Sequence, residues 1–163
     1  MNTKNFTVFL LECLAGTIIG FLIYRNYPVI GAWSLFSIIL VLAPDKKDAV
    51  SLALNRVKAN LIGALIALMI SIFHPISLPI LCLGVALSML LCKWLNLEAV
   101  TKSAIVAIMI IAMHVPGQNF YEIALERAFG VLLGCLIGVM VTWAFHYLSI
   151  YTGWIVGKVK KES

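Results

Sequence analysis

Residues 53–69, ALNRVKANLIGALIALM, and residues 124–140, ALERAFGVLLGCLIGVM, are two copies of one stretch, 71 positions apart. Eight of the seventeen positions are identical, and they include an arginine (Arg56 and Arg127) and a glycine (Gly63 and Gly134) in each copy. A repeat of this length indicates that one structural unit was duplicated. In each copy an arginine precedes an apolar stretch, which would hold a charge at a membrane boundary. We expect such an arrangement in a small transporter or channel.

The composition is that of an integral membrane protein. Of the 163 residues, 63% are hydrophobic and only 12% are charged, and the mean hydropathy is +1.05. A spanning helix needs ~20 mostly apolar residues. Six stretches approach this length: Phe6–Tyr24, Pro28–Ala43, Asn60–Phe73, Leu78–Leu95, Ala99–Val115 and Ala128–Tyr147. The sequence therefore predicts an all-α membrane protein with six transmembrane helices.

The lysines and arginines predict the orientation of these spans. With the N-terminus inside, ten of the twelve basic residues fall on the inner side, and only Arg25 and Arg127 fall on the outer side. Cytoplasmic loops carry the excess of Lys and Arg. We therefore expect a multi-pass protein of the inner (plasma) membrane with both termini in the cytoplasm. The net charge of +5 is explained by this topology and gives no support to nucleic-acid binding.

The repeats are three spans long, an odd number, so the two copies run in opposite directions through the membrane. The sequence thus predicts an inverted 3+3 repeat within a single transmembrane domain covering residues 1–163. Repeat one covers about residues 1–75, repeat two about 76–150, and residues 151–163 form a basic cytosolic tail. Inverted repeats are the plan of many secondary transporters, whose sites lie near the membrane midplane between the halves.

Small residues follow each arginine at four-residue spacing. Gly130, Gly134 and Gly138 form one such ladder, and Ala59, Gly63 and Ala67 occupy the same ladder in the first copy. Such ladders commonly serve close packing of helices in lipid. A second interpretation is that bare backbone beside an arginine leaves space for an anionic solute. The two interpretations are compatible.

The order of these residues resembles a known family. Pro28, Trp33, Ser37, Val41 and Pro44, then Arg56 and Gly63, and later Arg127, Gly130 and Gly134, resemble the fusaric acid resistance and aromatic acid exporter superfamily. The plant aluminium-activated malate channels are distant relatives of that superfamily. The resemblance covers essentially the whole chain.

This resemblance implies the export or conduction of organic anions. It implies solute-binding roles for Arg56, Arg127, Trp33, Ser37, Gly63 and Gly134, with Trp33 able to stack on an aromatic solute. The chain departs from the family pattern at Ala59-Asn60, where members often have Gly-Thr, and in the charged residues after Pro44. Members also commonly carry a large cytosolic domain after the sixth helix. We expect such a domain to be missing, truncated after Ser163, or supplied by a separate subunit.

One acidic residue, Glu12, lies inside the first predicted span. An ionised carboxylate there is costly unless it is paired. We consider two roles: a buried ion pair with Arg56 or Lys102, or proton coupling of transport.

Other residues give no sign of catalysis or cofactor binding. The four cysteines lie in apolar spans, and the three histidines lack a metal-ligand spacing, so we expect neither a metal nor a cofactor. The sequence also lacks a phosphate-binding glycine loop and a nucleophile with a base, which argues against an enzyme.

We therefore expect a membrane transporter that exports small organic carboxylate anions, aromatic ones among them. The alternatives are a passive organic-anion channel of the same fold and a non-transporting membrane scaffold subunit. Six spans leave little room for a sealed pathway within one chain. We expect a homo-oligomer, most simply a two-fold homodimer, with a glycine or alanine ridge near the contact.

Overall fold

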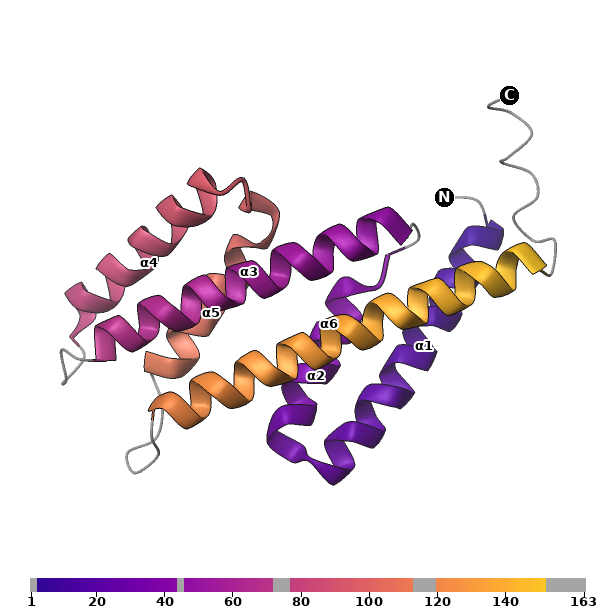
Figure 1. Cartoon of the computed structure of the whole chain (residues 1–163), viewed down its shortest axis with the longest axis horizontal. Coiled ribbons are helices and arrows are strands. Elements are labelled where there is room, and N and C mark those ends of the chain that lie inside the picture. Colours follow the sequence, from indigo (N-terminus) through magenta and orange to yellow (C-terminus); the bar gives the residue numbers. More distant parts are fainter. Residues whose placement is uncertain (1–2, 44–45, 72–76, 113–119, 152–163) are drawn as a thin grey trace. The chain divides into compact units, whose positions relative to one another are not determined.

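A computed structural model of the chain describes residues 3–43, 46–71, 77–112 and 120–151, and these are almost entirely helical. The elements in chain order are α1 (Thr3–Asn26), α2 (Pro28–Val41), α3 (Lys46–Ser71), α4 (Leu78–Trp94), the short 3₁₀ helix η1 (Glu98–Val100), α5 (Thr101–Ala112) and α6 (Phe120–Tyr151) (Figure 1). The prediction of an all-α protein is confirmed.

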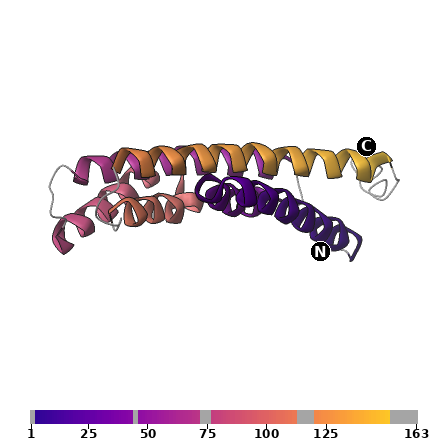
Figure 2. The ribbon, with the colours of Figure 1, turned by 90° about the horizontal axis from the view of Figure 1, so that it is seen from below.

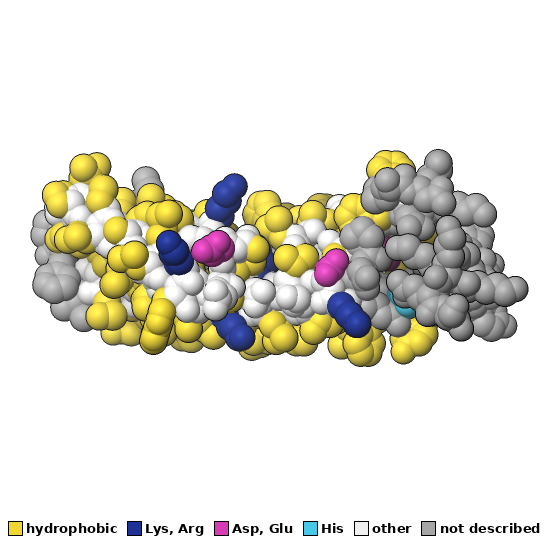
Figure 3. Space-filling model, turned by 90° about the horizontal axis from the view of Figure 1, so that it is seen from above, with side chains coloured by type: hydrophobic (Ala, Val, Ile, Leu, Met, Phe, Trp, Pro, Cys, Tyr) yellow, Lys and Arg dark blue, Asp and Glu magenta, His cyan; other side chains and the backbone are white. Residues whose placement is uncertain are grey.

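Several of these helices have the length and composition of membrane spans. Three apolar stretches are long enough to cross a bilayer, namely Phe6–Asn26, Lys47–Ile70 and Tyr121–Leu148, and the helices Pro28–Val41 and Leu78–Trp94 are apolar but shorter. On the face shown in Figure 3, hydrophobic side chains make up much of the surface and charged side chains are few. Many large apolar residues are exposed, as expected for a protein whose surroundings are lipid. Whether all six helices cross the membrane stays a prediction.

Two helices begin before the apolar spans that the sequence predicted. The third span was predicted to begin at Asn60, but α3 is one continuous helix from Lys46. Likewise α6 begins at Phe120, eight residues before the predicted Ala128. The added residues are mostly good helix formers such as alanine, leucine, glutamate and lysine, with no proline or glycine to end the helix. Hydropathy locates apolar spans, whereas helices continue through polar flanks.

The described helices belong to two compact units. The first comprises residues 1–53 and 133–163, and the second comprises residues 54–132. Because α3 and α6 each contribute residues to both units, this division differs from the predicted repeats, whose boundary lies near residue 75. The division of the chain into those repeats stays a prediction.

In the first unit, α1 and α2 form a tight hairpin that lies on one side of the C-terminal part of α6 (Figures 1 and 2). Pro28 stands at the start of α2, where its fixed φ suits the first helical turn. Small residues allow α1 and α2 to approach closely, since a Cβ at Gly20 would lie 3.1 Å from Leu35 Cγ. Within this unit Ile38, Leu42 and Val141 form a buried apolar cluster.

In the second unit, α4 and α5 lie on one side of the C-terminal part of α3 (Figures 1 and 2). The turn after α4 contains Asn96 at φ 54°, a left-handed conformation that asparagine tolerates better than most residues. An apolar cluster joins α3, α5 and α6 through buried residues, which are Ala64, Ile66, Ala67, Ile70, Ile108, Ile111 and Ala124. This cluster holds together the helices that carry both arginines of the repeat.

The two repeated glycines lie in closely matched helix contacts, one in each unit. In the second unit, a Cβ at Gly63 of α3 would meet the carbonyl oxygen of Ala104 and lie 2.8 Å from Ala107 Cβ of α5. In the first unit, a Cβ at Gly134 of α6 would meet the carbonyl oxygen of Ser34 and lie 2.7 Å from Ser37 Cβ of α2. Each glycine therefore permits contact between helix backbones, which is the packing role expected of small residues in lipid.

Candidate functional site

A buried pair of polar side chains lies within the second unit. Arg127 Nε, on α6, donates a hydrogen bond of 3.0 Å to Asn60 Oδ1, on α3. Arg127 is 2% exposed and Asn60 is 1% exposed, so both side chains are almost fully withdrawn from the surface. Ionisable side chains inside a membrane protein are rare because their burial is costly, and they usually mark functional sites.

Arg56 brings a second positive charge to the same unit. It lies one helical turn before Asn60 on α3 and is half-buried. Its charge acts on Arg127, and the interaction is unfavourable because both groups are cationic. At reduced local dielectric such repulsion is stronger than in water. A bound anion near these groups would offset the repulsion.

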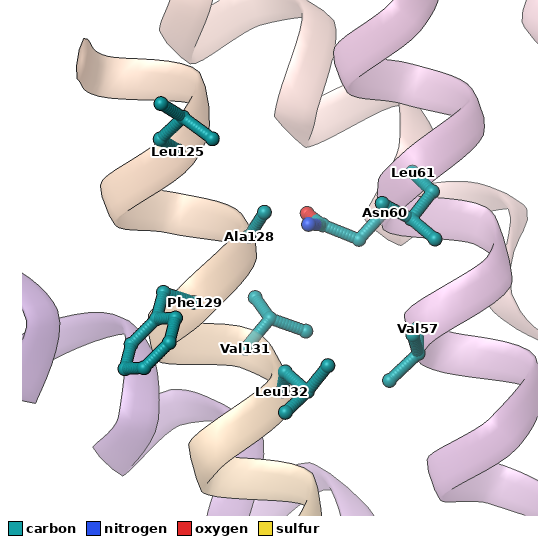
Figure 4. Close-up of a pocket in the computed structure, with 8 residues that line it drawn as sticks. All are labelled: Val57, Asn60, Leu61, Leu125, Ala128, Phe129, Val131 and Leu132. Carbon is teal, nitrogen blue, oxygen red and sulfur yellow. The ribbon is translucent and has the colours of Figure 1, made fainter.

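An apolar pocket adjoins the polar pair. It has a volume of about 180 Å³, and it is lined by Val57, Asn60, Leu61, Leu125, Ala128, Phe129, Val131 and Leu132. Figure 4 shows the Asn60 side chain extending from α3 toward Ala128 on α6, so that its amide group faces the pocket. Asn60 is the only polar side chain among these eight lining residues.

The hydrogen-bonding groups at this place are mainly donors. An arginine side chain has five N–H donors and no acceptor. Because Arg127 Nε can only donate, the amide oxygen of Asn60 must face it, and this orients the amide nitrogen with its two donors elsewhere. A solute in the pocket would thus meet the amide of Asn60 among apolar walls, and Arg127, which does not line the pocket, lies hydrogen-bonded to that amide. Such a site suits an anion with an apolar body and repels a cation.

The other residues predicted for the site occupy different places. Gly63 shares the second unit with both arginines but is packed against α5. Ser37 and Gly134 belong to the first unit, where Ser37 is fully buried beside the glycine in the α2–α6 contact. Trp33, half-buried on α2, lies 6.5 Å from Phe36 between ring centroids, with the rings tilted by 45°. A solute-binding role for these four residues stays a prediction.

Glu12 lies in the first unit and is 3% exposed. Among the residues that the structure describes, its Oε2 atom has no hydrogen-bond partner. Arg56 and Lys102, the predicted ion-pair partners, belong to the second unit. The predicted ion pair therefore stays untested, and Glu12 is a buried carboxyl group with one oxygen unsatisfied within its own unit.

The cysteines and acidic residues form no metal site in the described part of the chain. No group of three or more His, Cys, Asp or Glu side chains is close enough there to hold a metal ion. Cys13, Cys82, Cys92 and Cys135 form no disulfide bonds within the described residues. His74 and His114 lie outside the described residues.

Sequence reasoning missed the amide and the pocket. In the sequence Asn60 is marked only by its departure from a family pattern, although an asparagine four residues after an arginine in an apolar helix is itself a signal. The pocket residues carried no comparable signal. Phe129 and Leu132 are indistinguishable from lipid-facing side chains when only the sequence is known.

Comparison with known proteins identifies a family. A family model described as fusaric acid resistance protein-like matches residues 29–141, which is more than half of the chain. No curated protein and no solved structure matches the chain. The matched segment includes Arg56, Asn60 and Arg127, together with every residue that lines the pocket.

Proposed function

The chain belongs to the fusaric acid resistance protein-like family, and on this premise we propose that it exports small organic carboxylate anions, aromatic ones among them. The family consists of membrane transporters that export compounds. The carboxylate substrate is our inference from the second unit of the structure. Arg127 would attract the carboxylate group of the anion, and Arg56 would be the second cationic group.

The observation that carries this proposal is the buried hydrogen bond between Arg127 and Asn60 at the edge of an apolar pocket. A buried guanidinium supplies a permanent positive charge and offsets part of the desolvation cost of an anion. The apolar walls suit a hydrocarbon body. Apolar cavities of ~150 Å³ can hold benzene, so a pocket of about 180 Å³ has room for one aromatic ring.

We further propose that the chain is an inverted 3+3 repeat of six spans in the inner membrane, with both termini cytoplasmic. The matched contacts of Gly63 and Gly134 support the repeat, because equivalent residues of the two copies make equivalent backbone contacts. The excess of lysine and arginine on one side supports the orientation.

Glu12 is the residue that we propose for proton coupling. Transfer of an unpaired carboxylate out of water costs several kcal/mol, and protonation removes most of that cost. A carboxyl group that is 3% exposed, with one oxygen lacking a partner among the described residues, is suited to carry a proton through a transport cycle.

Flux measurements in proteoliposomes test the function. The purified protein is reconstituted, and uptake of labelled benzoate is measured with and without a proton gradient, with protein-free vesicles giving the leak. Gradient-dependent uptake supports an exporter. Voltage-dependent current without coupling would instead identify a passive channel, and absence of flux for any anion would identify a scaffold subunit.

The arginines are tested in the same assay with an Arg56→Ala, Arg127→Ala double variant. The proposal expects flux to be lost while membrane insertion and assembly persist. A double variant that inserts and transports at the normal rate would refute the anion path through these residues.

A further inference from the structure

The two copies of the repeat differ at one buried position beside their arginines. Asn60 follows Arg56 by four residues in the first copy, and Val131 follows Arg127 by four residues in the second. Both side chains are buried, at 1% and 2% exposed, and both line the apolar pocket. The duplicated framework therefore contains two arginines but only one amide at this position.

The amide of Asn60 accepts a hydrogen bond from Arg127 Nε. Nε–H lies in the plane of the guanidinium group, so a hydrogen bond from Nε to Asn60 Oδ1 restricts the orientation of that plane. Hydrogen bonds from charged donors are shorter and stronger than neutral ones. Val131, the repeat equivalent of Asn60, has an apolar side chain that cannot accept a hydrogen bond, so the second copy has the arginine but not the amide.

We propose that Asn60 is a positioning residue that fixes the orientation of Arg127 and so sets the selectivity of the transporter for planar carboxylates. A guanidinium of fixed orientation can match the two oxygens of a carboxylate with two parallel donors. This inference rests on the proposed function, and adds to it the residue that determines specificity.

The alternative role for Asn60 is purely structural. In that case its loss would alter stability and change the flux of all anions by the same factor. The positioning role makes a different prediction, because a spherical anion gains nothing from the orientation of the guanidinium plane. The ratio of benzoate flux to chloride flux separates the two roles.

The experiment compares Asn60→Val with wild type in proteoliposomes, using benzoate and chloride as probes. We expect the benzoate-to-chloride flux ratio to fall by about tenfold, since a hydrogen bond to a charged group is worth about that factor or more. The fall should arise from a higher KM for benzoate, with chloride flux maintained. Asn55→Val is the matched control, because it makes the same change on α3 away from the pocket residues, and it should keep the wild-type ratio.

A double-mutant cycle adds a second test. Lysine has no Nε–H of the arginine kind, so Asn60 cannot orient it in the same way. In an Arg127→Lys background, Asn60→Val should therefore leave the flux ratio unchanged. If the valine variant fails to insert, Asn60→Ser, which keeps a polar atom but shortens its reach, gives the same test.

An unchanged ratio in well-inserted Asn60→Val would overturn the inference while leaving anion export intact. An equal fall of the ratio with and without the Arg127→Lys substitution, or a similar fall in Asn55→Val, would overturn it as well. Absence of both benzoate and chloride flux in the wild type would instead overturn the proposed function, and this inference with it.

Discussion

Replacing either repeated glycine by alanine tests the helix packing most directly. In Gly134→Ala the new methyl carbon would lie 2.7 Å from Ser37 Cβ and 2.9 Å from Ser34 Cα, both on α2. In Gly63→Ala it would lie 2.8 Å from Ala107 Cβ and 2.9 Å from Ala104 Cα, both on α5. Backbone atoms are involved in each case, so rotation of a side chain cannot relieve the contact.

The size of the effect follows from these separations. The optimal separation of non-bonded carbon atoms is ~3.5–4.0 Å, so the two helices must move apart by most of an ångström. A gap of that size loses about a quarter to a half of the van der Waals attraction between them. Overpacking of this kind typically costs ~1–3 kcal/mol. Alanine is the better helix former by roughly 0.8–1 kcal/mol, which offsets part of the loss. We expect each variant to be destabilised by about 1–2 kcal/mol.

The assay is reversible unfolding in mixed detergent micelles, followed by circular dichroism. Gly138→Ala is the control, because its added Cβ would lie no closer than 3.2 Å to Ile38 O and Val41 Cβ. In Gly138→Ala the cost of the closer contact and the stabilisation from the higher helix propensity of alanine should nearly cancel. If Gly134→Ala is as stable as Gly138→Ala, the close contact of α2 and α6 is refuted. Clearly unequal costs at Gly63 and Gly134 would contradict the equivalence of the two copies.

Three further predictions concern transport and assembly. Arg127→Ala should lower benzoate flux by about tenfold or more, since a charge-assisted hydrogen bond is lost. Arg127→Lys should retain part of the benzoate flux because the positive charge survives. Equal flux in the two variants would argue against a role for the charge. Glu12→Gln, which mimics the protonated carboxyl, should abolish proton-driven uptake but keep benzoate exchange without a gradient, and normal proton-driven uptake would exclude Glu12 as the coupling residue. Native mass spectrometry in mild detergent should show two copies of the chain, and a monomer that still transports after dilution would contradict the predicted homodimer.

The positions of most helices could be predicted from the sequence. The second and fourth predicted spans agree with α2 and α4 to within two residues at each end, because proline marks their starts and polar residues follow their ends. The starts of α3 and α6 could not be predicted from hydropathy. Charged residues precede both apolar spans, namely Lys46, Lys47 and Asp48 in α3 and Glu122 and Glu126 in α6, and helix propensity continues the helix through them.

The candidate site was predicted only in part. Arg56 and Arg127 could be selected because they occupy the same position in both copies of the repeat, just before an apolar stretch. Burying the Asn60 amide in an apolar setting also costs free energy, though less than burying a charge. Its importance, however, depends on its partner Arg127, which is 67 residues away in the sequence. A contact between α3 and α6 cannot be read from the spacing within either helix. The identity of the partner needed the structure.

The repeat itself shows why hydropathy finds spans but not pockets. Its identical pairs are of different physical kinds: Gly63 and Gly134 are buried in helix contacts, whereas Leu61 and Leu132 are 49% and 46% exposed. In lipid, a leucine that faces outward and one that faces a neighbouring helix have nearly the same free energy, because the surroundings are apolar in both cases. Only small and polar residues distinguish the two faces. The arginines and glycines could therefore be selected from the sequence, while the leucines and Phe129 that form the pocket wall could not.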